Sequence, residues 1–107
     1  MDLRLVMTTV PDEDFAQRIS LALVQEKLAA CVSSIPISQS VYVWEGNLQK
    51  TAEIQLVIKT VSWKLEELAM RLSELHPYEL PEFVVIKPEA AGTAWMSWVR
   101  THTGGAQ

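Results

Sequence analysis

The chain has 107 residues, of which 49% are hydrophobic and 21% are charged, and its formal net charge is −4. A chain of this length forms one domain that buries about two-thirds of its unfolded surface, so the composition predicts a globular protein. An acidic balance without a run of Lys or Arg argues against binding to a nucleic-acid backbone. No apolar run approaches the ~18 residues of a membrane-spanning helix, so we expect neither nucleic acid nor membrane as a partner.

The first quarter of the chain predicts a strand followed by a helix. Residues 3–9 are apolar enough for a central strand. Pro11 and the acids at 12–14 suit a first helical turn, because proline needs no amide partner there and carboxylates meet the positive end of the helix dipole. Apolar residues recur at helical spacing from Phe15, which predicts a helix that ends near Lys27.

Residues 29–60 predict a long β-hairpin. Two runs rich in β-branched and aromatic residues flank the turn signal Glu45-Gly46-Asn47. Pro36 lies within the first run, and because proline has no amide hydrogen for a sheet, we expect a bend there. Each arm of about 13 residues would span about 40 Å, whereas a 15-residue helix spans roughly 22 Å. The outer hairpin, with Ile37, Val41, Val43 and Trp44, therefore needs other cover, and we expect it from another copy of the chain.

The remaining residues predict a second helix capped by Ser62 and ended by His76-Pro77, a fourth strand over 83–87 and a short helix over 93–101. The order β-α-β-β-α-β predicts an α+β, ferredoxin-like sandwich with the extended hairpin and a C-terminal helix. Its first and third strands should be central, with both main helices on one face. We expect a single domain over residues 1–102 and a disordered tail over 103–107.

Several motifs stand in a fixed order along the chain: Leu28-Ala29-Ala30-Cys31-Val32, Tyr42 and Trp44 before Glu45-Gly46, Ile58-Lys59-Thr60, and Leu75-His76-Pro77-Tyr78 with Pro81-Glu82. Together they resemble the CutA family of divalent-cation tolerance proteins. The resemblance covers the chain from Leu3 to Val99 and implies a homotrimer joined through the long hairpins, with an association with copper or other divalent cations.

The metal ligands that the resemblance implies are only partly present. Family members credited with copper ligands have a Cys late in the first strand and a His-His pair before the proline. The matching positions here are Thr8, and Leu75 followed by His76. Copper prefers nitrogen and sulfur ligands, so His76 is the one candidate metal ligand and we expect weak binding of Cu(II) or another divalent cation, without a required cofactor.

The loop from His76 to Glu82 is the best candidate for a ligand site, although a rigid connection between helix and strand explains its two prolines equally well. Lys59, Tyr78, Glu82 and Trp44 could line a cleft between subunits, as in the trimeric PII signalling proteins, which are the alternative functional class. Lys59 could instead pair with Glu82, and Trp44 is favoured as an interface anchor.

No motif in the chain favours catalysis. No serine lies in a Gly-x-Ser-x-Gly turn, and Cys31 adjoins no helix N-terminus that would activate its thiol. Cys31 is more typical of a sheltered thiol than of a reactive one. Because no catalytic motif is present, we expect a non-enzymatic protein. The single cysteine and the lack of a secretory signal pattern predict a cytoplasmic location. A structural scaffold for another protein remains a third hypothesis.

Overall fold

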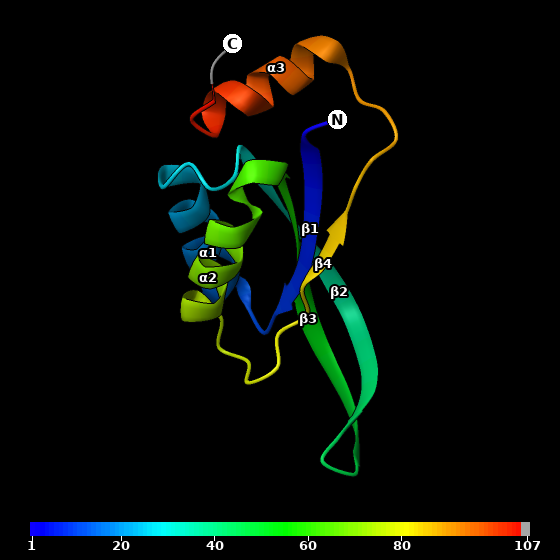
Figure 1. The fold of residues 1–107 in the computed structure, drawn as a ribbon. Helices are drawn as coiled ribbons and strands as arrows, with labels where there is room; N and C mark the ends of the chain where they lie inside the picture. Colours follow the sequence, from blue (N-terminus) through cyan, green and yellow to red (C-terminus); the bar gives the residue numbers. More distant parts are fainter. Residues whose placement is uncertain (106–107) are drawn as a thin grey trace.

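Two long antiparallel strands extend beyond the rest of the molecule (Figure 1). In the computed structural model, which describes residues 1–105, β2 covers Cys31–Trp44 and β3 covers Asn47–Val61. The two residues between them, Glu45 and Gly46, have φ angles of 50° and 79°. Positive φ at both positions is the geometry that a two-residue hairpin turn needs. The predicted hairpin and its turn are confirmed.

The first arm of the hairpin is one continuous strand with a bulge. Ile37 lies opposite Glu53, and Ser40 lies opposite Thr51, so two residues of β2 oppose one residue of β3 between these pairs. Pro36 itself stays in register, because β2 is an edge strand and the proline can turn its missing donor away from the ladder. The irregularity therefore falls just after the predicted position at Pro36.

The four strands form a sheet of order β2-β3-β1-β4, in which β1 covers Leu3–Val10 and β4 covers Val84–Ile86. All three pairings are antiparallel, and β1 and β3 are central. Helices α1 (Glu13–Gln25) and α2 (Leu65–Leu75) pack on one face of this sheet (Figure 1). The α+β, ferredoxin-like architecture is as the order of elements predicts.

The helix ends differ in how well the sequence predicts them. Asp12 caps α1 by accepting a hydrogen bond from the amide of Phe15 at 2.9 Å. Ser62, the expected cap of α2, has no capping side-chain bond. Its amide instead donates to the carbonyl of Asp2 at 2.8 Å, which extends the pairing of β1 with β3. A 3₁₀ turn at Ser62–Lys64 therefore precedes the α-helix, and Ser62 is wrong as the N-cap.

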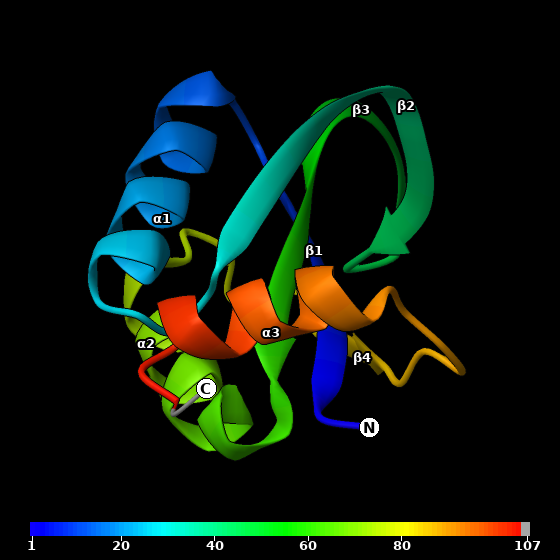
Figure 2. The ribbon, with the colours of Figure 1, turned by 90° about the horizontal axis from the view of Figure 1, so that it is seen from above.

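A third helix, α3 (Thr93–His102), crosses the end of the sheet near the start of β1 (Figure 2). It covers a small apolar cluster that is separate from the main core between the sheet and α1 and α2. This second cluster consists of Leu3, Ala30, Val61, Met96 and Val99.

The tail expected to be disordered begins in an ordered segment. Thr103 is buried and its hydroxyl donates to the carbonyl of Val99 at 2.9 Å, while the amide of Gly105 donates to the carbonyl of Arg100 at 2.9 Å. These hydrogen bonds continue the turns at the end of α3 through residue 105. Residues 106–107 lie outside the described residues.

Large apolar side chains remain exposed on the outer hairpin and on the edge strand β4. On the outer hairpin they are Val41, Tyr42, Val43, Trp44 and Leu48, and at β4 they are Phe83, Val84, Val85 and Ile86. Within residues 1–105, no helix is both long and apolar enough to cross a membrane.

Candidate functional site

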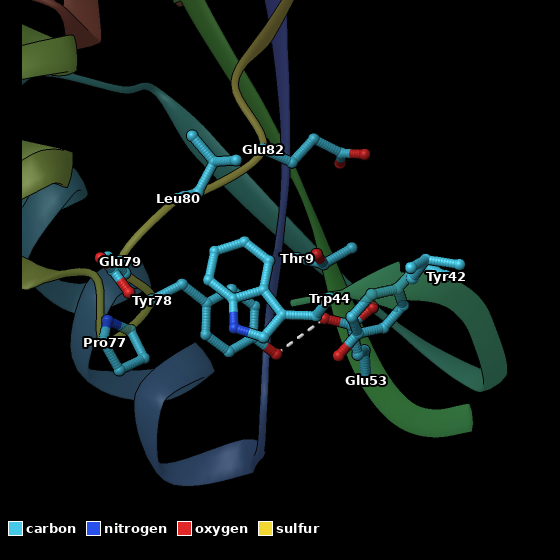
Figure 3. Close-up of a pocket in the computed structure, with 10 residues that line it drawn as sticks. Thr9, Tyr42, Trp44, Glu53, Pro77, Tyr78, Glu79, Leu80 and Glu82 are labelled. Atoms are coloured by element: carbon cyan, nitrogen blue, oxygen red, sulfur yellow. Dashed lines mark hydrogen bonds between the residues drawn. The ribbon is translucent and has the colours of Figure 1, made fainter. Parts of the chain in front are cut away.

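The outer hairpin and the loop between α2 and β4 enclose a pocket of about 520 Å³ (Figure 3). One wall comes from the hairpin and carries Tyr42, Trp44 and Glu53, while the other comes from the loop after His76. The complete lining is Thr9, Tyr42, Val43, Trp44, Glu53, Pro77, Tyr78, Glu79, Leu80 and Glu82. Three of the four residues predicted to share a cleft, namely Trp44, Tyr78 and Glu82, are therefore brought together within one chain.

Lys59, the fourth predicted cleft residue, lies elsewhere on the sheet. Its ammonium group donates to the hydroxyl of Ser33 and lies 3.8 Å from the sulfur of Cys31. The cross-strand register explains this placement, because Lys59 is directly opposite Cys31. Within residues 1–105 it forms no ion pair with Glu82 and does not line the pocket.

His76 is a structural part of the wall behind the pocket. Its side chain is buried, with Nε2 2.9 Å from the carbonyl of Thr9 and 3.1 Å from the hydroxyl of Thr8. Its Nδ1 accepts a hydrogen bond from the amide of Tyr78 at 3.1 Å. This acceptor role assigns the ring proton to Nε2, which donates to Thr9. Burial lowers the pKa of His76 despite the hydrogen bond to Thr9 and the charge of Glu53, so the ring is held neutral.

Tyr78 joins the loop to the hairpin. Its hydroxyl donates to Oε2 of Glu53 at 2.7 Å, the bond drawn as a dashed line in Figure 3. Its ring lies 5.0 Å from the ring of His76. Burial raises the pKa of Tyr78 well above its ordinary value of 10.0, and the hydrogen bond to Glu53 adds to this rise. The phenol is therefore a fixed donor at neutral pH.

Glu53 is the pocket residue that the sequence did not single out. It is only 8% exposed, although the alternation along β3 places it beside Gln55 and Val57 on the sheet face that lacks α1 and α2. Its burial comes from the loop that folds over this end of the sheet and brings Tyr78 to it. In the sequence, Glu53 is a single acidic residue directly before the buried part of β3. A single acidic residue at such a position does not predict that its side chain is buried.

The described residues do not fit a metal site within one chain. No group of three or more His, Cys, Asp or Glu side chains among residues 1–105 is placed to hold a metal ion. Both ring nitrogens of His76 are engaged in hydrogen bonds, and its neighbour at residue 8 carries a hydroxyl rather than a thiol. A threonine hydroxyl is a poor ligand for copper, which prefers nitrogen and sulfur.

Comparison with known proteins identifies the family. Residues 4–102 match the family described as CutA1 divalent ion tolerance protein. The chain belongs to this family. A curated relative, the divalent-cation tolerance protein CutA of Thermus thermophilus, is 38% identical over 99 residues, which is 92% of this chain and 96% of the relative.

Solved structures of the family share the same fold. CutA from Xylella fastidiosa has a TM-score of 0.92 at 40% identity, covering 96% of this chain and 99% of that one. CutA from Synechococcus elongatus also has a TM-score of 0.92, at 43% identity, covering 95% of this chain and 90% of that one. The CutA resemblance drawn from the sequence motifs is confirmed.

Proposed function

We propose that this protein acts in divalent-cation tolerance as a non-enzymatic homotrimer, with copper as the cation that the family resemblance implies. Membership of the CutA1 family supports the role in tolerance. The observation that carries the assembly is the exposed apolar surface of the outer hairpin.

Self-association follows from the surfaces that one chain leaves uncovered. Val43 is 66% exposed and Leu48 is 65% exposed, and Val41 and Trp44 are exposed beside them, while Ile37 is half-buried. Contiguous exposed apolar surface is typical of protein–protein interfaces. The sheet also has open edges at β2 and β4 that can pair with another chain. The number three comes from the resemblance to the family.

One pair of side chains that resembles a nucleophile and its base is unsuited to that role. Thr8 and His76 place a hydroxyl beside an imidazole, with 3.1 Å between Oγ1 and Nε2. Thr8 is fully buried, however, and the ring proton on Nε2 is directed to the carbonyl of Thr9. A buried hydroxyl beside a nitrogen that donates cannot be activated for attack on a substrate.

Copper binding by a single chain should be weak, because His76 would have to break its hydrogen bonds to Thr9 or Tyr78 to coordinate a metal. The alternative of a PII-like metabolite sensor gains no support from the comparisons. Lys59, one of the residues that could line the cleft of such a sensor, is engaged with Ser33 and Cys31.

Two measurements test the proposal. Sedimentation equilibrium should give a mass of three times the 12.0 kDa of the chain, and a well-folded monomer would contradict the assembly. A strain that lacks the gene should grow poorly at raised copper concentration and recover when the gene is restored. Unchanged growth in copper, zinc and cobalt would contradict the role in tolerance.

A further inference from the structure

The bulge of β2 lies where the hairpin leaves the four-stranded sheet. It consists of Ser38 and Gln39, which together oppose Ala52 of β3. The last described pair of β1 with β3 joins Val10 to Ile54, two positions before Ala52 along the hairpin. From the bulge outward, the described part of the hairpin is therefore a ribbon of two strands without support from β1.

The hairpin bends as it extends beyond the sheet. A bulge bends the strand that carries it and increases its local twist, and Figure 2 shows β2 and β3 arching together. Outside the bulge, five cross-strand pairs run from Ser40 with Thr51 to Trp44 with Asn47. At about 3.3 Å per residue, they place the turn roughly 16 Å beyond the bend. A small change of angle at the bulge therefore moves the tip of the hairpin a long way.

The inner side of the bulge is held in place by the loop after α2. Glu53, which directly follows Ala52, is buried and accepts a hydrogen bond from the hydroxyl of Tyr78 at 2.7 Å. The amide of Tyr78 in turn donates to Nδ1 of His76 at 3.1 Å. Because the hairpin is anchored beside the bulge, its direction beyond that point depends on the bulge.

The residues of the bulge serve neither the core nor the register. Ser38, Gln39 and Ala52 are all exposed, and none of them belongs to either apolar cluster. With one residue fewer in β2, Ser38 would oppose Ala52 in a regular ladder, and the pairs on both sides would keep their partners. An extra residue interrupts the ladder and leaves backbone groups unpaired. Its remaining role is to shape the hairpin.

The shape of the hairpin determines where its apolar tip meets another chain. Val43 and Leu48, the most exposed apolar side chains of the tip, lie beyond the bend. In a ring of three, each chain contacts the next through two different surfaces, and the ring closes only if each contact turns the chain by a third of a circle. The angle of the outer hairpin enters that rotation directly.

We propose that the bulge at Ser38 and Gln39 fixes the angle at which the outer hairpin meets the next chain, and thereby closes the assembly at three. This inference rests on the proposed homotrimer and adds the element that decides its closure.

Deletion of Gln39 tests the proposal by sedimentation equilibrium. The deletion removes the extra residue and keeps the cross-strand pairs on both sides. We expect the variant to fold, with the circular dichroism of the wild type, and to lose the trimeric mass. It should give smaller species or a mixture of larger open ones, because the contact no longer closes. A trimeric mass at the concentration where the wild type is trimeric would overturn the proposal.

Gln39→Ala is the matched control, because it removes the same side chain and keeps the extra residue. It should keep the trimeric mass. Loss of that mass in Gln39→Ala would assign the effect to the side chain rather than to the bulge, which would contradict the proposal.

A second variant covers the case in which the deletion does not fold. Replacing Ser38 and Gln39 by a single threonine also removes the bulge, and threonine has a high propensity for strands. It should lose the trimeric mass as well. If neither variant folds while Gln39→Ala does, the bulge is needed by the single chain, and the proposal is wrong.

The wild-type mass separates this proposal from the proposed function. A trimeric wild type with a trimeric deletion variant overturns the role of the bulge and leaves the homotrimer standing. A monomeric wild type contradicts the proposed assembly itself, and the role of the bulge falls with it.

Discussion

The hydroxyl of Thr8 lies 3.1 Å from Nε2 of His76, although the two residues are 68 positions apart in the chain. They occupy two of the three places where the family resemblance implies metal ligands, the third being Leu75. In this chain the pair is a buried hydrogen bond within the wall of the pocket, and His76 orients Tyr78 through its other nitrogen. The same closeness means that a single substitution can test whether metal ligands are missing here.

Thr8→Cys should create a metal site. It places a thiol beside the imidazole of His76, and thiolate with imidazole suits Zn²⁺, which has no redox chemistry to complicate the titration. Calorimetry should show weak Zn²⁺ binding by the wild type and at least about tenfold tighter binding by Thr8→Cys. Adding His76→Ala to that variant should abolish the gain. If the variant with both substitutions keeps the tighter Zn²⁺ binding, His76 is not a ligand of the new metal site.

The buried imidazole of His76 predicts a dependence of stability on pH. Burial lowers the pKa of His76 from 6.5, so the unfolded chain binds a proton at a pH where the folded chain does not. The stabilisation is fully present above pH 6.5 and is lost as the pH falls below that value through the lowered pKa. Urea unfolding at fixed protein concentration should show this loss.

The second histidine of the chain provides the control for this pH dependence. His102→Gln should keep the wild-type slope of stability between about pH 5 and pH 7, because His102 is exposed. His76→Gln should flatten the slope. Equal slopes in the two variants would assign the pH dependence to groups other than His76.

Tyr78→Phe should destabilise the protein. The change removes the hydroxyl that donates to Glu53 at 2.7 Å and leaves a buried carboxylate without its donor, which costs about 1–3 kcal/mol. Tyr42→Phe is the matched control, because its hydroxyl contacts Thr51 at 3.5 Å on an exposed part of the hairpin. We expect about 0.5 kcal/mol or less there. Equal costs in urea unfolding would show that the bond to Glu53 adds nothing.

The sequence predicts the fold well because local patterns encode it. Helical spacing in α1 and the Glu45-Gly46 turn each depend on near neighbours. The pocket depends on contacts between distant segments, which no local pattern reports. The register of β2 and β3 places Lys59 within hydrogen-bonding distance of Ser33. Glu53 is buried by a loop that lies 25 residues further along the chain. Tyr78, Trp44 and Glu82 were found because two prolines and a turn mark their segments, whereas nothing in β3 marks Glu53.

The outer hairpin makes the sharpest prediction about assembly. Val43 is 66% exposed on β2, and Val43→Glu puts a charge where we propose that another chain packs. Burying an unpaired charge in an interface is strongly unfavourable, so this variant should dissociate or fail to accumulate as folded protein.

Met70→Glu is the matched control, because Met70 is 67% exposed on α2, on the helical side of the sheet. Sedimentation equilibrium should give the trimeric mass for Met70→Glu and a smaller mass for Val43→Glu. If both variants keep the trimeric mass, the interface lies outside the outer hairpin. If Met70→Glu dissociates instead, the helical face carries the contact and the edge strands remain free.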